Sequence, residues 1–231
     1  MKRNVSLAEI SDGKLYGEND MVRADCHGCS GCAECCRGMG SSIILDPYDV
    51  YRMTTRLGKT LSELLEGYIE LNVVDGVILP NLQMAGKKEE CSFLDENGRC
   101  SIHSVRPGIC RLFPLGRYYE NGDFRYFLQT GECSAERGKI KVRKWIDTPG
   151  LQQNHRFVVK WHYLLNQLED IIKQHMAGKA SQAEGAGWAD ETKQMNLFLL
   201  QTFYMTPYDG GRDFYEQFDE RVARFRQVVP E

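Results

Sequence analysis

The spacing of apolar residues along the chain predicts several helices. After position 46, the apolar side chains Val50, Met53 and Leu57 recur every three or four residues, as on one face of a helix. A capping residue followed by proline favours a helix start, because proline lacks an N–H and the first helical turn has no partner for one. This pair occurs at Asp46-Pro47, Thr148-Pro149 and Thr206-Pro207.

Further helices are predicted after residue 60 and throughout the last part of the chain. The sequence Thr60-Leu61-Ser62-Glu63 has the form of a capping box, so we expect a helix from there to about Leu71. Two shorter helices are expected over 191–205 and 211–229, and residues 179–187 are expected to form a flexible connection. One stripe of a long helix is formed by Leu151, His155, Val158, His162, Leu165, Leu168 and Ile172.

Two Asn-Gly pairs predict β-hairpins. Asn97-Gly98 and Asn121-Gly122 are each flanked by apolar residues, and Asn-Gly suits the two-residue hairpin turn. We therefore expect local β-structure only. Together the patterns predict an α+β, mostly helical fold, in which a small cysteine-rich core with short hairpins is followed by packed C-terminal helices.

Composition fits an ordinary globular chain of this size. With 231 residues, of which 42% are hydrophobic, the chain can bury a core without disulfides. We expect a polar lead-in over 1–22, a metal-binding cysteine domain over 23–147 and a helical region over 148–231 packed on it. No apolar run reaches the length of a membrane span, which predicts a cytoplasmic protein without membrane insertion. A net charge of −3 argues against nucleic acid as a partner.

The cysteines change this picture. All nine fall between positions 26 and 133, five of them within eleven residues in CHGCSGCAECC. In a reducing compartment, an odd number of crowded thiols indicates metal ligands or catalytic groups rather than disulfides. Tandem Cys-x-x-Cys pairs let the chain turn so that several thiolates point at one metal centre.

Two metal chemistries compete for these thiols. Zinc is usually held by two separated Cys-x-x-Cys knuckles, and here only the first is present. Cys26, Cys29, Cys32 and Cys36 instead reproduce the spacing of a bacterial ferredoxin run, although Arg37 stands where those ferredoxins have proline. Because no second copy of the run exists, a simple ferredoxin is not expected.

Charge favours an anionic centre. Residues 97–119 contain four arginines and no carboxylate, in a chain that is acidic overall. Guanidinium groups stabilise a negatively charged iron–sulfur cluster, although surface pairing or an anionic substrate would also explain them. The four are Arg99, Arg106, Arg111 and Arg117.

The first hairpin predicts that two of the thiols are separated. If Asn97-Gly98 is a tight turn, Cys100 lies opposite Asp95, and Cys91 is four residues further along its strand, about 13 Å away. Either the ladder is irregular or the two cysteines serve different sites. We favour two centres over one.

The complete pattern resembles the YkgJ-like cysteine-cluster family. The resemblance spans about residues 26–145, through CxxCxxCC ending at Cys36, CSFLDENGRCSIHSVRPGICRLFP from Cys91 to Pro114, and Cys133. That family is described as zinc- or iron-chelating and includes the flagellin lysine N-methylases. The resemblance implies that Arg106 and Arg111 frame the cofactor. It implies eight metal ligands: Cys29, Cys32, Cys35, Cys36, Cys91, Cys100, Cys110 and Cys133.

Some positions keep more than one interpretation. Cys26 lies outside the eight and is either spare or a substitute ligand. His27 and His103 are candidate ligands, but we favour loop histidines that form hydrogen bonds. Vicinal Cys35 and Cys36 are hard to place on one ion, which indicates bridging between centres or a redox role for one of them.

Three functions follow from these patterns. The favoured one is a metal-binding protein with one or two iron–sulfur clusters of the 4Fe-4S type, which transfers electrons or senses redox state with a protein partner. The second is a protein lysine N-methyltransferase that uses S-adenosylmethionine on a protein substrate such as flagellin, although the chain has no Gly-x-Gly-x-x-Gly or radical-SAM cysteine motif. The third is an interaction module stabilised by zinc. No catalytic residue is assigned.

Overall fold

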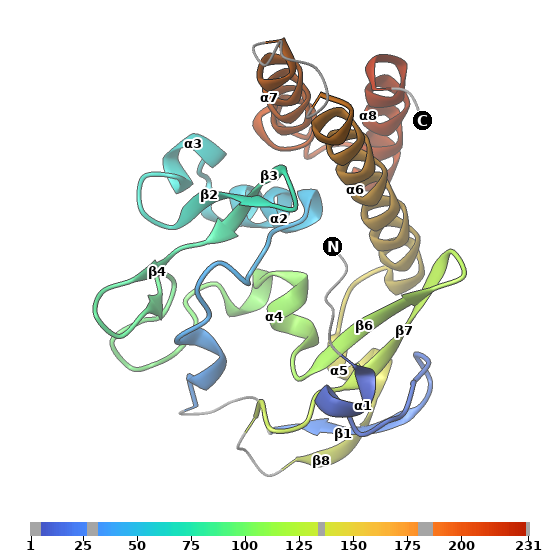
Figure 1. Ribbon diagram of the computed structural model, residues 1–231. Coiled ribbons are helices and arrows are strands. Elements are labelled where there is room, and N and C mark those ends of the chain that lie inside the picture. The colour runs from blue at the N-terminus through green and yellow to red at the C-terminus, as the bar shows by residue number, and fades with distance from the viewer. Residues whose placement is uncertain (1–5, 27–31, 134–136, 180–186, 230–231) are drawn as a thin grey trace.

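The computed structural model describes residues 6–26, 32–133, 137–179 and 187–229, with side chains of 176–179 and 187–190 left aside (Figure 1). The helices are α1 (Leu7–Ile10), η2 (Glu34–Cys36), α2 (Pro47–Leu57), α3 (Leu61–Leu64), η3 (His103–Val105), α4 (Gly108–Leu112), α5 (Val142–Ile146), α6 (Leu151–Lys179), α7 (Gly187–Leu200), η4 (Gln201–Met205) and α8 (Phe214–Val228). The strands are β1 (Met21–Asp25), β2 (Ile69–Val74), β3 (Val77–Leu82), β4 (Met84–Ala85), β5 (Glu90–Cys91), β6 (Leu115–Glu120), β7 (Asp123–Leu128) and β8 (Gly138–Lys141). They pair in four antiparallel two-stranded sheets: β1–β8, β2–β3, β4–β5 and β6–β7.

Helix α2 begins where the Asp-Pro pair predicts. The Asp46 side chain accepts a hydrogen bond from the Asp49 N–H, and the Asp49 carboxylate accepts one from the Asp46 N–H. This reciprocal capping box satisfies two N–H groups that have no partner within the helix. Gly58 ends the helix with a φ of 63°, in the left-handed region that glycine enters without strain.

The predicted helix from Thr60 to Leu71 is wrong beyond its first turn. Its capping box is present, but α3 ends at Leu64, and the chain enters β2 at Ile69. β2 pairs with β3 across the turn Asp75-Gly76. The sequence patterns did not predict this hairpin, because its turn contains no Asn-Gly pair. Six cross-strand pairs stabilise this hairpin, and the alternating burial of β2 fits the strand period better than the helix period.

The two Asn-Gly turns differ from each other. Asn121 and Gly122 both have positive φ, at 51° and 78°, and connect β6 to β7 in a regular six-pair hairpin, as predicted. At Asn97-Gly98 only the glycine has positive φ, and the Gly98 N–H donates to the Asp95 carbonyl. This longer turn leaves a single bridge instead of the expected ladder.

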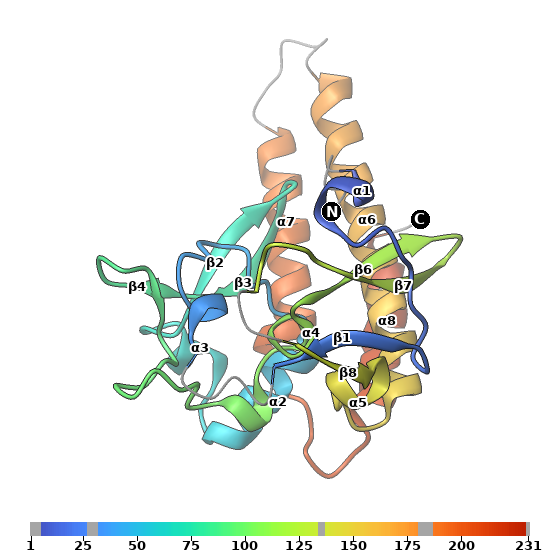
Figure 2. The same cartoon turned by 90° about the horizontal axis from the view of Figure 1, so that it is seen from below.

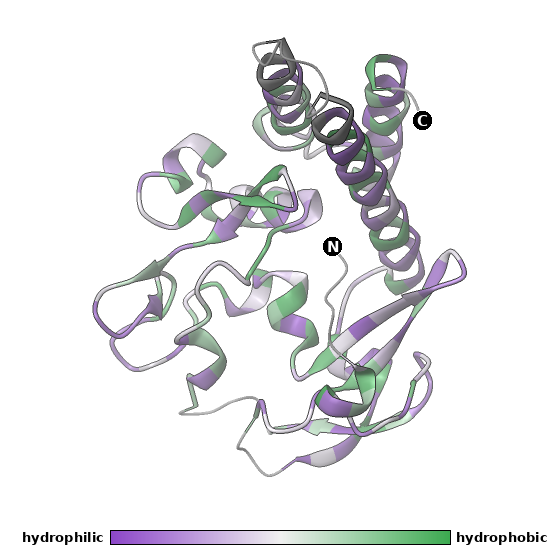
Figure 3. Ribbon diagram, in the orientation of Figure 1, coloured by the Kyte–Doolittle hydropathy of each residue, from purple (hydrophilic) through white to green (hydrophobic). Residues whose placement is uncertain are grey.

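The predicted C-terminal helices are present, but one of the predicted starts is wrong. Thr206-Pro207 ends the π-helical turn η4, and α8 begins only after Asp213, whose side chain accepts from the Glu216 N–H. The connection expected over 179–187 lies almost entirely outside the described residues. Figure 3 shows polar and apolar residues alternating along α6 and α8, as expected for helices with one buried face.

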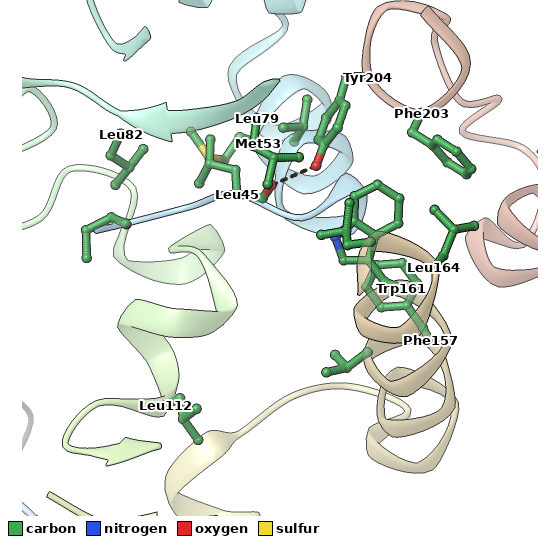
Figure 4. Close-up of a cluster of buried hydrophobic side chains, with 14 of the residues drawn as sticks. Leu45, Met53, Leu79, Leu82, Leu112, Phe157, Trp161, Leu164, Phe203 and Tyr204 are labelled. Atoms are coloured by element: carbon green, nitrogen blue, oxygen red, sulfur yellow. Dashed lines mark hydrogen bonds between the residues drawn. The ribbon is translucent and has the colours of Figure 1, made fainter. Parts of the chain in front are cut away.

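One continuous core joins the helices to the cysteine-bearing part of the chain. Fully buried Phe203 packs with Trp161 beside α2 and β3, and the Tyr204 hydroxyl donates a 2.9 Å hydrogen bond to the Leu45 carbonyl (Figure 4). From α7, the Asn196 amide accepts from the Ile78 N–H and donates to the Gly76 carbonyl at the tip of the β2–β3 hairpin. The fold is therefore α+β and mostly helical, with packed C-terminal helices, as the sequence predicts.

The β1–β8 sheet brings together residues more than one hundred positions apart. Met21 pairs with Lys141 and Asp25 with Gly138, and Figures 1 and 2 show the two strands side by side next to α5. This sheet clamps the two ends of the cysteine-bearing segment. Within the described residues, no helix is both long and apolar enough to span a membrane.

Candidate metal centre

The described cysteines come from six places in the fold. Cys26 follows β1, and Cys133 lies beyond β7, so the β1–β8 pairing draws these two parts of the chain toward each other. The remaining described cysteines lie in or before η2, at the end of β5, before η3 and on α4: Cys32, Cys35, Cys36, Cys91, Cys100 and Cys110.

All eight of these cysteines line one cavity of about 520 Å³. Seven belong to the predicted ligand set, and the eighth is Cys26, which the sequence leaves as spare or substitute. The other predicted ligand, Cys29, and the candidate His27 lie outside the described residues. Residues up to 107 positions apart in the chain thus present thiols to the same space.

Backbone contacts explain how the amino-terminal cysteines reach Cys91. Arg37 pairs with Glu90 as an isolated antiparallel bridge, and its guanidinium Nε donates to the Glu90 carboxylate at 2.8 Å. The Gly38 N–H donates to the Glu89 carbonyl. These contacts fasten the residues directly after η2 to β5, the strand that ends at Cys91.

Cys91 and Cys100 are not separated by a regular ladder, in contrast to the distance expected for a tight hairpin. The chain turns directly after Cys91, where the Leu94 N–H donates to the Cys91 carbonyl at 2.8 Å. Leu94, rather than Asp95, forms the bridge to Cys100. Of the two alternatives left open by the sequence, the structure therefore shows the irregular ladder, and both thiols line the same cavity.

Four thiols, that of buried Cys91 and those of three half-buried cysteines, influence one another electrostatically. Burial raises the pKa of Cys91 and Cys100 and raises that of Cys110 further, and each of these pKa values is raised additionally by the charge of neighbouring cysteines. The neighbours involved are Cys35 and the other members of the same group. For Cys35 itself, the hydrogen bond with Cys36 is the first cause of the raised pKa and burial the second.

Helix α2 holds the helix that carries Cys110. The second oxygen of the Asp49 carboxylate, which is 4% exposed, accepts the Gly108 N–H at 2.7 Å at the first turn of α4. Arg52 on the same face of α2 donates to the Ser104 carbonyl of η3 at 2.8 Å. Asp49, a member of the capping box of α2, thus helps to fix the position of α4 and of Cys110 on it.

The arginines of residues 97–119 divide into two groups. Arg99 and Arg106 line the cavity, and the positive charge of Arg106 lowers the pKa of Cys100 and Cys35 against the larger effects that raise them. Buried Arg111 is not among the lining residues: it donates to the carbonyls of Asp147 and Ser104 at 2.9 and 3.0 Å. Arg117 lies over the ring of Phe124.

Several lining residues carry no signal that the sequence pattern identified. Glu34 and Glu132 each precede a lining cysteine, and the indole N–H of Trp145 donates to the carbonyls of Leu112 and Phe113 while its ring forms part of the wall. His103 also lines the cavity, and its Nε2 contacts the Arg106 guanidinium. His103 begins η3 instead of lying in a loop, and whether it is also a ligand stays a prediction.

The thiols line the cavity without forming a closed coordination sphere. Among the described residues, no three cysteine, histidine or carboxylate side chains lie close enough together to hold one metal ion. The donors in the wall are nevertheless mainly thiols, eight of them beside two carboxylates and one imidazole. This set suits zinc or iron–sulfur centres rather than calcium or magnesium.

Comparison with known proteins agrees with this donor set. Residues 28–134 match the family named CxxCxxCC, described as a putative zinc- or iron-chelating domain. No solved structure was matched by the chain. The matched segment contains every cysteine except Cys26, together with Arg99 and Arg106. The part of the chain that supplies most of the cavity wall is therefore similar to the CxxCxxCC family.

Proposed function

We propose that this protein binds an iron–sulfur centre in the cysteine-lined cavity and uses it in electron transfer or redox sensing. One observation carries the proposal: eight thiols from separate segments face one cavity. When bound, such a cluster supplies one-electron chemistry. We further propose that residues 23–147 form the metal-binding domain and that 148–231 support it.

The cavity fits a group larger than a single ion. Four thiolates around zinc at about 2.3 Å close into a tetrahedron with no space left inside. A cavity of about 520 Å³ with eight thiols provides more room and more donors than one such site uses. These quantities favour a polynuclear centre, with one or two clusters held by the predicted cysteine ligands.

Within the cavity, Cys35, Cys91, Cys100 and Cys110 are our first candidates for one ligand set. They lie within electrostatic reach of one another, and they come from η2, β5, the bridge before η3, and α4. Arg106 places a guanidinium near Cys35 and Cys100, where it offsets negative charge collected by thiolates. Cys36, Cys32, Cys133 and Cys29 remain as proposed ligands of a second centre.

The test is the metal content of protein purified without oxygen. We expect iron, acid-labile sulfide and visible thiolate-to-iron absorption in the wild-type protein, and loss of most iron in Cys91→Ser and Cys110→Ser. Cys26→Ser, which changes a lining thiol outside the predicted ligand set, is the matched control and is expected to keep the absorption.

Two other results would redirect the function. Colourless protein with stoichiometric zinc and no sulfide would contradict the iron–sulfur centre and favour the zinc-stabilised interaction module. Transfer of a labelled methyl group from S-adenosylmethionine to lysines of flagellin would favour the methyltransferase, for which no geometry among the described residues supplies support beyond the family resemblance.

A further inference from the structure

A cluster of unpaired positive charge lies on the β1–β8 sheet and the helix that follows it. Val22 is buried opposite Ile140, so the neighbouring side chains of both strands face outward. The lysines and arginines on this outward surface and on α5 form what we call the basic ribbon: Arg23, Lys139, Lys141, Arg143 and Lys144.

The basic ribbon is not neutralised by its own surroundings. No ion pair is found for its five side chains within the described part of the chain, whereas eight other pairs are present there. Four carboxylates adjoin these segments: Glu18, Asp20, Asp25 and Asp147. Three of them have other partners, because Asp20 accepts from the Gly17 N–H, Glu18 lies 3.8 Å from His155 and Asp147 lies 4.0 Å from Arg111. A net positive surface thus exists on a chain whose formal charge is −3.

An apolar side chain lies in this charged surface. Met21, which is 50% exposed, pairs directly with Lys141 across the two strands. Protein interfaces are enriched in methionine and arginine, and an apolar centre within a polar rim is their usual anatomy. Met21 and the two arginines of the basic ribbon are thus of the kinds enriched at interfaces, and its three lysines suit the polar rim rather than the centre.

The basic ribbon is continuous with the cavity wall. β1 ends one residue before Cys26, and Gly138 at the start of β8 pairs with Asp25 at this same end. Both Cys26 and Cys133, five residues before β8, line the cavity. A molecule seated on the basic ribbon would therefore lie against the part of the protein that leads to the thiols.

We propose that the basic ribbon docks an acidic protein that exchanges electrons with the metal centre. The exchange of electrons rests on the proposed function, whereas the docking depends only on the charged surface. A protein fits better than nucleic acid, because the positive surface covers one short sheet of an acidic chain and has an apolar residue among its charges.

The first experiment measures binding of labelled poly-L-glutamate, as a probe for acidic protein surfaces, by fluorescence anisotropy. We expect binding at low ionic strength that is lost at high salt, since exposed charges are screened beyond about 10 Å at 0.1 M. Lys139→Glu/Lys144→Glu should weaken it about tenfold or more. Arg143→Glu/Lys144→Glu, confined to α5, provides a second variant should the first fail to fold.

The control reverses two exposed lysines elsewhere, Lys87→Glu/Lys88→Glu, between β4 and β5. Absent binding, equal loss in the control, or unchanged binding in both ribbon variants would overturn the docking proposal. Tighter binding of a DNA duplex of matched charge or of anionic vesicles, lost in the same variants, would overturn it in favour of those partners. Iron and sulfide assays on the same preparations test the proposed iron–sulfur centre independently of the docking.

Discussion

Arg106 is the cationic residue with the most direct electrostatic effect on the cavity. Burial lowers the pKa of His103 and the charge of Arg106 lowers it further, and the same charge partly offsets the larger effects that raise the pKa of Cys35 and Cys100. A nearby positive charge stabilises the more negative, reduced state of an iron–sulfur centre and raises its reduction potential.

We therefore expect Arg106→Gln to lower the reduction potential while the iron content stays close to that of the wild type. Potentiometric titration followed in the visible spectrum measures the change. Arg125→Gln is the control, because Arg125 pairs with Glu120 on the β6–β7 hairpin and is not among the cavity-lining residues. An unchanged potential in Arg106→Gln would contradict the assigned role.

His162 makes the free energy of unfolding depend on pH. It stacks on Tyr119 at 3.5 Å between ring centroids, and burial lowers its pKa to about 4. In the unfolded chain a histidine has a pKa of about 6.5, so between these values the unfolded state binds a proton that the folded state does not. The free energy of unfolding therefore falls as pH falls from about 6.5 to about 4.

His162→Gln should remove this contribution to the pH dependence. Urea unfolding of both proteins at pH 8 and pH 5 gives the comparison, because at pH 8 the wild-type histidine is neutral in both states. We expect a smaller loss of stability on acidification in the variant. Equal losses in the two proteins would show that His162 does not contribute.

At the scale of elements, α2 is the support of the candidate centre. Asp49 accepts both the Asp46 N–H of its own capping box and the Gly108 N–H of α4, while burial raises the pKa of its carboxyl well above the usual range. One side chain therefore links the start of α2 to the helix that carries Cys110.

Asp49→Ala leaves two half-buried N–H groups, those of Asp46 and Gly108, without their acceptor. We expect it to cost about 2–4 kcal/mol and to lower iron content by displacing α4. The control is Thr60→Ala, which removes the exposed capping residue of α3. We expect it to cost about 1 kcal/mol. That variant should keep its metal. Denaturant unfolding measures the free energy of unfolding of both variants, and iron analysis measures their metal content. Full metal content in Asp49→Ala would contradict the role of Asp49 in supporting the centre.

At the scale of the whole molecule, one core serves the cysteine-bearing region and the C-terminal helices. Tyr204 and Asn196 reach from the helices to Leu45 and the β2–β3 hairpin through hydrogen bonds that join residues more than one hundred positions apart. Because the cysteine-bearing region and the C-terminal helices share a core, we expect them to unfold together in a single cooperative transition.

We therefore expect thermal unfolding of metal-loaded protein to give the same midpoint by visible absorption of the centre and by far-ultraviolet circular dichroism of the helices. Anaerobic removal of the metal with a chelator should lower both midpoints, because ligands that bind only the folded state stabilise it. Loss of the visible signal well before the helices melt would show two independent units and contradict the shared core.

Local signals predicted the elements that depend on local energetics. The capping box at Asp46, the type of turn at Asn121-Gly122 and the amphipathic stripe of α6 are properties of neighbouring residues, so the sequence predicts them well. The stretch after Leu64 is a strand, despite the helix prediction, because β3 supplies cross-strand partners that no local window contains. Thr206-Pro207 ends a helical turn rather than beginning a helix.

The candidate site shows the same division. By itself, the sequence determined which donors the protein has, thiols in metal-binding spacing with arginines between them, since ligand chemistry belongs to residue type and local spacing. Only the tertiary structure decided that Cys26, Cys91, Cys110 and Cys133 share a cavity, that Arg106 lines it, and that Arg111 supports it instead. Pairing of β1 with β8 and of Arg37 with Glu90 joins residues far apart in the chain, and such contacts are selected by the packing of the entire molecule.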